Sequence, residues 1–265
     1  MAISGPVPSI EADPAHLRFV DVVRPEATLL NLTEARRLLN RDSLTAAFPE
    51  ETALITTSTV ADRHASEWGD ELDLIRTLQP TLHIPADGPV YTTQQPIQRG
   101  TTTLDCLEGA AWMRDQLAGT ETDVLPLLKG IHPRERELCY RVFDRLGYKQ
   151  CAFYAGQYFS GGAGPVELAH DLTQITEATD CTIVGLGVLA PGCLRRLPEA
   201  VTAAAGINAW REAVEPQSAT DSELRERYDR FVAEVEDALR DSSRQPERDE
   251  SHTAATADSI TQEVH

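Results

Sequence analysis

The clearest hydrophobic pattern lies near the middle of the chain, where it predicts strand, helix and strand in succession. Val124–Leu128 is an apolar run broken only by Pro126, as expected of a strand buried on both faces. A segment with apolar residues at helical spacing follows, and Gly147 is placed to end it. Cys151–Ala155 is a second apolar run. This βαβ unit predicts parallel neighbouring strands with a right-handed crossover.

The same alternation of short apolar runs and amphipathic segments extends along most of the chain. Leu17–Val23 and Ala27–Leu30 are each candidates for a first strand, and Leu194–Ala204 reads as a helix before a short last strand. The later predicted strands end at Thr56, Pro85, Leu128, Gly156, Gly187 and Asn208. Alternation of this kind is typical of an α/β protein. It favours a TIM-type (β/α)₈ barrel, whole or irregular, over an open sheet, with the number of strands left open.

The pattern also divides the chain into three parts. Residues 1–16 are polar and contain prolines, and they predict a loose N-terminal arm. Residues 17–240 form a single predicted barrel domain, which ends in the amphipathic segment Asp221–Leu239 packed on the outside of the barrel. Residues 241–265 contain almost nothing to bury, so we expect a disordered acidic tail.

Composition adds a strong acidic bias and an unusual choice of cation. The formal net charge is −18, and lysine occurs only at Lys129 and Lys149. We interpret this as the surface of a protein adapted to high salt, which screens the self-repulsion of the excess charge. No signal peptide or membrane-spanning run is evident, so we expect a cytoplasmic protein with no membrane partner. The five cysteines show no metal-ligand spacing, and no metal site is predicted.

Acidic proteins are poor non-specific binders of nucleic acid, although a local arginine patch would suffice. Arg134, Arg136, Arg141 and Arg145 lie on one predicted helix. They read either as such a patch or as a solvated face paired with neighbouring acids. Both interpretations stay open at this point.

Ligands of parallel α/β units bind at the carboxyl ends of the strands. The βαβ unit therefore predicts a rim built from Lys129, Gly130, Ala155, Gly156 and Gln157. Small residues at the end of the second strand would let the backbone approach a flat ligand closely.

Asp87 follows another predicted strand, Leu82–Pro85, and its carboxylate could accept two adjacent hydrogen bonds. The alternative is a turn residue, since Asp-Gly is a common turn pair. Gly161–Gly164 precedes a predicted helix and is a weak candidate for a phosphate nest.

Six pieces follow one another in a recognisable order. They are a strand ending at Asp87, a helix with Trp112, a strand ending in Lys129-Gly130, a helix ending in Gly147-Tyr148, a strand ending in Ala155-Gly156, and a strand ending in Gly185-Leu186-Gly187. In this order Leu78–Gly187 resembles the core of the tRNA-guanine transglycosylase family, (β/α)₈ barrel enzymes that exchange guanine for a 7-deazaguanine. The absence of a zinc-binding cysteine cluster after the barrel is more similar to the virus- and plasmid-type branch, which modifies DNA.

The resemblance implies an exchange at the sugar C1′ of a nucleotide. A carboxylate attacks C1′, guanine leaves, and a 7-deazapurine displaces the carboxylate. The expected partners are nucleic acid, DNA favoured over tRNA, and a 7-deazaguanine base, with a second copy or a sister subunit as a further possibility. No cofactor is implied. Asp87 would read the edge of the base, Lys129 stands where the family has an amide side chain, and Asn208 completes the predicted base-binding set.

Two departures concern the catalytic carboxylates. The family's nucleophile follows the last matching strand, where this chain has Trp210, Arg211 and Glu212. The family's upstream Asp-Ser-Gly-Gly is replaced by Thr56–Thr59, with Asp62 the nearest acid. Asp62 and Glu212 are therefore the candidate catalytic residues. The alternatives are a non-catalytic barrel of the same ancestry that binds nucleic acid or a partner, and an unrelated barrel enzyme that holds a phosphorylated metabolite on Gly161–Gly164.

Overall fold

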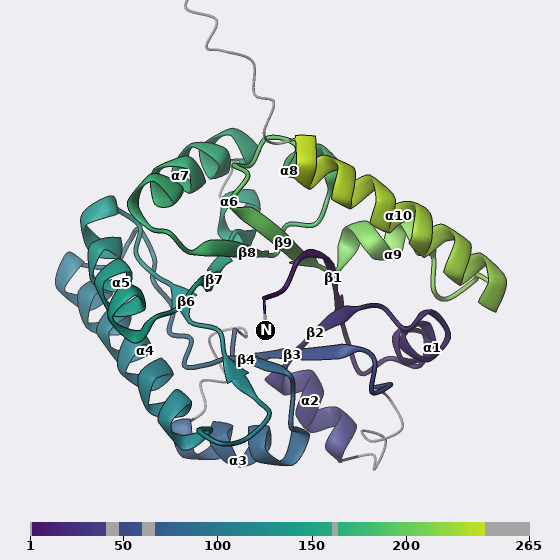
Figure 1. Ribbon diagram of the computed structural model, residues 1–265, viewed down its shortest axis with the longest axis horizontal. Coiled ribbons are helices and arrows are strands. Elements are labelled where there is room, and N and C mark those ends of the chain that lie inside the picture. The colour runs from purple at the N-terminus through teal and green to yellow at the C-terminus, as the bar shows by residue number, and fades with distance from the viewer. Residues whose placement is uncertain (1, 41–47, 60–66, 161–163, 242–265) are drawn as a thin grey trace, which may run out of the picture.

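The computed structural model describes residues 2–40, 48–59, 67–160 and 164–241. A curled parallel sheet of nine strands occupies the centre, and helices surround it (Figure 1). The strands run in the order β5-β4-β3-β2-β1-β9-β8-β7-β6. Their bounds are β1 Gly5–Ile10, β2 Ala27–Asn31, β3 Ala53–Thr57, β4 Leu82–Ile84, β5 Asp123–Val124, β6 Leu127–Leu128, β7 Gln150–Tyr154, β8 Thr182–Leu186 and β9 Val201–Gly206.

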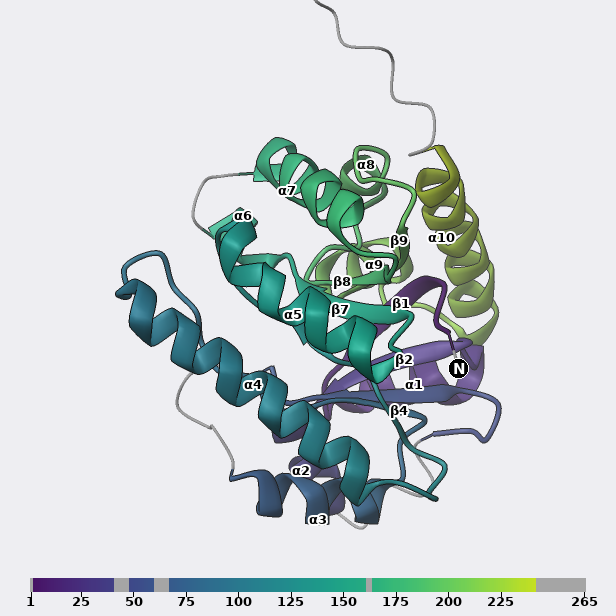
Figure 2. The same ribbon diagram turned by 60° about the vertical axis from the view of Figure 1, so that its left-hand side comes forward.

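The helices alternate with the strands, so the predicted α/β class is confirmed. Their bounds are α1 Pro14–Val23, α2 Leu32–Leu39, α3 Trp68–Leu78, α4 Pro96–Gln116, α5 Pro133–Leu146, α6 Gly156–Ser160, α7 Gly164–Ala178, α8 Pro191–Leu194, α9 Asn208–Val214 and α10 Asp221–Asp241. Helices α4, α5 and α7 lie in succession along one side of the molecule (Figure 2). The amphipathic segment near the C-terminus forms α10, which packs on α1, α8 and α9 as expected of an outer helix.

The two edge strands of the sheet belong to one short segment. Only Leu125 and Pro126 separate β5 from β6. The Leu125 N–H donates to the His83 carbonyl of β4 (2.9 Å), and the Ala152 N–H of β7 donates to the Pro126 carbonyl (2.9 Å). Residues 123–128 therefore contact strands from both ends of the sheet. The architecture is consistent with a TIM-like barrel, irregular where Pro126 lacks the N–H that a continuous ladder needs.

The N-terminal residues differ from the prediction. Gly5–Ile10 is strand β1, which lies between β2 and β9 at the centre of the strand order, and α1 begins at Pro14. The loose arm expected over residues 1–16 and the strand expected over Leu17–Val23 are therefore wrong. Two prolines interrupt the apolar run of β1, yet Pro6 and Pro8 lie in register with Ala204 and Gly206 of β9.

A second difference concerns the end of the barrel. The expected helix Leu194–Ala204 is divided, because α8 ends at Leu194 and β9 begins at Val201. Alanine favours helix when nothing else decides. Here pairing with β1 on one side and β8 on the other outweighs that preference.

The core has an inner and an outer part. Alternate strand residues fill the interior of the curled sheet, among them Val7, Ile55, Ile84, Leu127, Val184 and Ala205. The intervening residues pack outward against the helices. This alternation decides which side chains at the carboxyl ends of the strands face the mouth of the barrel.

Candidate functional site

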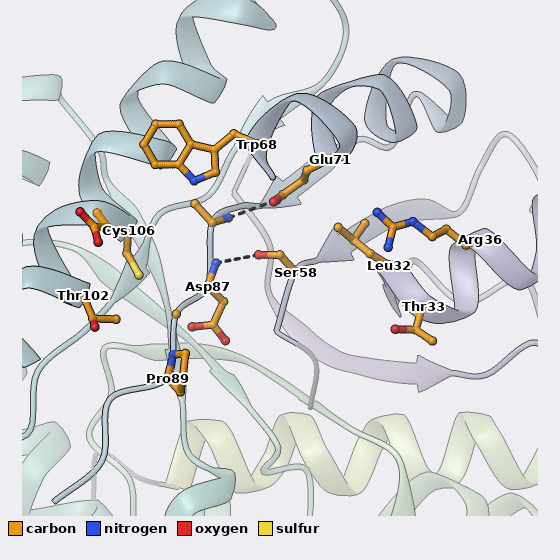
Figure 3. A pocket seen from close by; sticks show the side chains of 13 residues that line it. Leu32, Thr33, Arg36, Ser58, Trp68, Glu71, Asp87, Pro89, Thr102 and Cys106 are labelled. Atoms are coloured by element: carbon orange, nitrogen blue, oxygen red, sulfur yellow. Dashed lines mark hydrogen bonds between the residues drawn. The ribbon is translucent and has the colours of Figure 1, made fainter. Parts of the chain in front are cut away.

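The loop after β4 holds Asp87 in a defined position. The Ser58 hydroxyl, at the end of β3, donates to the Ile84 carbonyl (3.2 Å) and accepts from the Asp87 N–H (2.9 Å). Ala86 has a φ of 54°, in the left-handed region that non-glycine residues rarely adopt. Its N–H donates to Glu71 Oε1 of α3 (3.1 Å; Figure 3). Two neighbouring backbone amides are therefore anchored by side chains from other elements.

A buried polar network supports this loop from the helix side. Glu71 Oε1 also accepts from His83 Nε2 (2.7 Å), and His83 Nδ1 lies 2.9 Å from the Thr56 hydroxyl. All three side chains are buried. Because the carboxylate accepts, Nε2 carries a proton. The network thus links β3, β4 and α3 beneath Asp87.

Asp87 and Lys129 form an ion pair at the carboxyl ends of β4 and β6. Lys129 Nζ lies 2.5 Å from Asp87 Oδ1, and the side chains are only 11% and 14% exposed, for lysine and aspartate respectively. Lys129 follows β6 directly, and the segment 123–128 lies beside β4. Two residues that the sequence predicted for one ligand site are therefore in contact.

Asp87 also lines a cavity of about 300 Å³. Trp68 of α3 and Arg36 of α2 line other parts of its wall; in Figure 3 Asp87 lies beneath Trp68, and Arg36 lies farther away on the α2 side. Helix α4 contributes Thr102, Asp105 and Cys106. Burial raises the pKa of the Cys106 thiol, so Asp105 is the acidic group that α4 contributes to this wall. Lys129 is not among the lining residues; it reaches Asp87 from the β6 side.

The other predicted rim residues border the mouth of the barrel without lining this cavity. Gly130 follows Lys129 and has a φ of +112°. Ala155 is buried, and Gly156 begins α6 with Gln157 exposed beside it. A Cβ at Gly187 would lie 3.0 Å from the Gly156 backbone, so the ends of β7 and β8 approach each other closely.

The predicted catalytic residues are not brought to Asp87 within the described part of the chain. Glu212 lies exposed on α9, and Asn208 is the exposed first residue of that helix. Asp62 falls in residues 60–66, outside the described residues, although Ser58 and Trp68 on either side of that segment both line the cavity. Gly161–Ala163 of the glycine-rich segment also falls outside the described residues.

The arginines of α5 do not behave as one group, so they form neither a single basic patch nor a single solvated face. Arg136 is buried, and it donates to the Gly130 carbonyl (2.9 Å) and to Asp171 Oδ2 of α7 (2.7 Å). Tyr158 donates to the same Asp171 oxygen, and burial raises the Tyr158 pKa. Arg99 of α4 is buried too and pairs with Glu135 (2.6 Å). These charges join helices α4, α5 and α7 and leave Arg134, Arg141 and Arg145 exposed.

Sequence reasoning missed the residues that hold Asp87 in place. Glu71 and His83 lie in segments recognised only by their apolar pattern, and Arg36 and Trp68 were not connected with a site. A histidine inside the otherwise apolar strand β4 was the available signal. Its partner on α3 could not be identified, because pairing between separate elements is set by the tertiary fold.

Neither a scan against protein-family models nor a search of curated proteins finds a match. Within the described residues, no helix combines the length and the apolar character that crossing a membrane requires.

Proposed function

We propose that this chain is a base-exchange transglycosylase of the tRNA-guanine transglycosylase type. It would bind guanine or a 7-deazaguanine at the Asp87–Lys129 pair and exchange one for the other in a nucleic acid, DNA rather than tRNA. The observation that supports this proposal is the contact between the two rim residues, 2.5 Å apart and largely shielded from solvent.

The pair is complementary to one edge of guanine. The Watson–Crick edge of guanine presents the O6 acceptor next to the N1–H and N2–H donors. A carboxylate offers two acceptors to those donors, and the adjacent ammonium offers a donor to O6. Adenine presents a donor where guanine has O6, so it would place an amino group against the Lys129 ammonium.

The surroundings of Asp87 suit a small flat ligand. The cavity of about 300 Å³ lies at the lower end of the range usual for small-molecule sites. Trp68 supplies an aromatic face there, and the Ser58 and Glu71 hydrogen bonds hold the loop before the ligand arrives. A preorganised site of this kind costs little ordering on binding.

Calorimetric titration in molar salt with guanine, 7-deazaguanine and adenine tests the base-binding part. We expect both guanine-type bases to bind about tenfold or more tightly than adenine, from the 1–3 kcal/mol that a bidentate base contact usually contributes. Asp87→Ala should remove this preference, whereas Asp105→Ala, on the α4 wall, should keep it. Equal affinity for adenine, or an unchanged preference in Asp87→Ala, would refute the site.

The exchange itself is tested by incubating the protein with DNA or tRNA and a labelled 7-deazaguanine, followed by digestion and nucleoside analysis. Incorporation into DNA is the expected result. A second candidate function, a non-catalytic base-binding barrel, is favoured by one observation: Arg211 occupies the region where the resemblance places a catalytic acid. Guanine binding without incorporation into either polymer would support that candidate.

A further inference from the structure

We propose that a second base of the DNA substrate, the neighbour of the base held at the Asp87–Lys129 pair, stacks on the ring of Tyr154, an inference that rests on the proposed function. Tyr154 is the last residue of β7. Strand β7 pairs with β6, with Phe153 in register with Leu128. The next pair along the two strands is Tyr154 and Lys129, so the aromatic residue stands beside one of the two groups proposed to bind the base.

The strand pattern directs Tyr154 toward the mouth of the barrel. On β7, Ala152 faces the interior of the curled sheet and Phe153 packs in the outer core. With a period of two residues, Tyr154 continues the inner side. The same alternation on β6 places Leu127 in the interior and Lys129 two residues later. Both side chains therefore emerge at the mouth, from strands that lie about 4.8 Å apart.

Two glycines at the strand ends make room for the Tyr154 ring. A Cβ at Gly156 would lie 2.8 Å from Tyr154 Oη and 2.9 Å from its Cζ, and a Cβ at Gly187 would lie 3.8 Å from its Cε2. The ring therefore extends over the end of β7 toward β8. Lys129 extends the other way, to Asp87 after β4. Because the two side chains diverge, a base stacked on Tyr154 would be the neighbour of the base held at Asp87.

Tyr154 is both exposed and held in place. The residue is 42% exposed, although the other residues of β7 are buried. It lies in register with Leu186 of β8, and the next N–H along, that of Ala155, donates to the Leu186 carbonyl (2.7 Å). In the part of the chain that the structure describes, the other exposed aromatic residues are Tyr91, in a loop, and Phe159, on the short helix α6. Tyr154 is thus the exposed aromatic residue that a strand ladder preorganises, which lowers the cost of ordering on binding.

Stacking also suits the charge of this chain. The formal net charge of −18 repels a polyanion, and molar salt weakens the contacts that lysine and arginine make with phosphates. Stacking of a base on an aromatic ring needs no net charge and tolerates any base. A contact of this kind can therefore retain single-stranded DNA at the mouth under conditions in which ion pairs with its backbone contribute little.

Two ligands separate polymer binding from base binding. A labelled single-stranded DNA oligonucleotide with one guanine is titrated by fluorescence anisotropy in molar salt, and free guanine by calorimetry. Tyr154→Ala should bind the oligonucleotide about tenfold or more weakly, as expected for the loss of one stacked base. It should keep its affinity for free guanine within about threefold, because the groups that contact the edge of the base remain.

Three further measurements distinguish stacking from a structural role. Tyr154→Phe keeps the ring and should bind the oligonucleotide within about threefold of the wild type. Leu104→Ala, which removes an apolar side chain of similar exposure (44%) from α4, is the matched control and should bind as the wild type does. Oligonucleotides that lack the base on the 5′ or the 3′ side of the guanine test the DNA side of the contact. One of these two removals should weaken wild-type binding about tenfold and should have little further effect in Tyr154→Ala, because both changes delete the same contact.

Several outcomes would overturn the inference. They are an unchanged oligonucleotide affinity in Tyr154→Ala, an equal loss in Tyr154→Phe, and a loss that occurs in Phe159→Ala instead. A wild type that binds guanine but no oligonucleotide, or that is indifferent to both neighbouring bases, would also overturn it; the second of these results needs no variant to fold. A wild type that binds no guanine would instead refute the proposed function at its base-recognition step. The two failures are measured with different ligands and are therefore distinguishable.

Discussion

The two lysines of the chain lie at opposite ends of the barrel and in contrasting surroundings. Lys129 follows β6 at the carboxyl ends of the strands, where it is largely buried against Asp87. Lys149 precedes β7 at the other end, exposed, and lines a cavity of about 480 Å³. The larger of these two cavities therefore lies at the end where the described residues show no ion pair as well shielded as Asp87–Lys129.

The difference follows from the direction of the helices. The cavity at Lys149 is lined by residues that end α4 and α5, Leu117 and Gly147, and helix C-termini carry partial negative charge. Arg114 donates there to the Leu146 carbonyl (2.6 Å). At this end, a cationic side chain therefore binds a carbonyl group at a helix C-terminus. At the other end, carboxylates that are largely shielded from solvent hold the Asp87 loop and the cations Arg99 and Lys129 in place.

The largest expected effect concerns Glu71. Glu71→Ala would leave the His83 ring and the Ala86 amide buried without their acceptor. We expect the free energy of unfolding to fall by about 3–5 kcal/mol, because leaving each of the two buried donors without an acceptor costs about 1–3 kcal/mol. Glu121→Ala, exposed at the opposite end, should change it by less than about 0.5 kcal/mol. Urea unfolding measures both, and equal losses would remove the contrast between the two ends.

The two lysines allow the same substitution to be compared directly. Lys129→Met leaves Asp87 shielded from water without its partner, so we expect a loss of about 2–3 kcal/mol, as for a hydrogen bond to a charged group. Lys149→Met, at an exposed position, should stay within about 0.5 kcal/mol. Thermal and urea unfolding of both variants would show this ranking. A larger loss for Lys149→Met would contradict this ranking. It would mean that the fold depends more on the charge of Lys149 than on the Asp87–Lys129 pair.

Two glycines with positive φ provide a finer comparison. At Gly130 (φ +112°) a Cβ would lie 3.1 Å from the Arg136 N and the Glu135 carbonyl carbon. At Gly119 (φ +84°), at the opposite end, it would meet open space. We expect Gly130→Ala to cost about 2 kcal/mol and Gly119→Ala about 1 kcal/mol, since backbone strain of 1–3 kcal/mol applies to both and crowding only to the first. Only Gly130→Ala should also weaken guanine binding in the same titration, because it displaces Lys129.

The smallest expected effect is a pH dependence at the end that carries the site. Burial lowers the pKa of His16 below its usual 6.5. Between the folded and unfolded pKa values the unfolded chain binds more protons, so stability is full above about pH 6.5 and falls as the pH decreases through that window. The stability difference between pH 7.5 and 5.5 should therefore be smaller in His16→Gln than in the wild type, by about 1 kcal/mol or less. The lowered pKa values of Glu51, Glu135 and Glu223 act at more acidic pH, below 4.5. An identical pH dependence in the variant would contradict the buried neutral ring.

Local pattern was a good guide where strands and helices were regular. The helix and the second strand of the βαβ unit, the outer helix α10 and the strand before Asp87 were predicted with nearly correct bounds. The single strand expected over Val124–Leu128 is instead divided into β5 and β6, which pair with β4 and β7 at the two ends of the sheet. The pattern gave a wrong prediction at two strands. The prolines of β1 indicated a loose arm, although β1 pairs with β2 and β9. The alanines of β9 indicated a helix, although β9 pairs with β1 and β8. In both cases pairing with distant strands decided the structure, and such pairing leaves no local mark.

For the candidate site, the sequence by itself determined that Asp87 and Lys129 stand at strand ends, because residues that follow apolar runs of parallel strands share one edge. Only the tertiary structure decided that the two touch, that Glu71 and His83 hold the loop, and that Tyr154 stands beside Lys129 at the end of β7. The physical reason is that a strand end sets the edge on which a side chain lies. Its partner depends on the order in which strands of distant sequence close around the barrel.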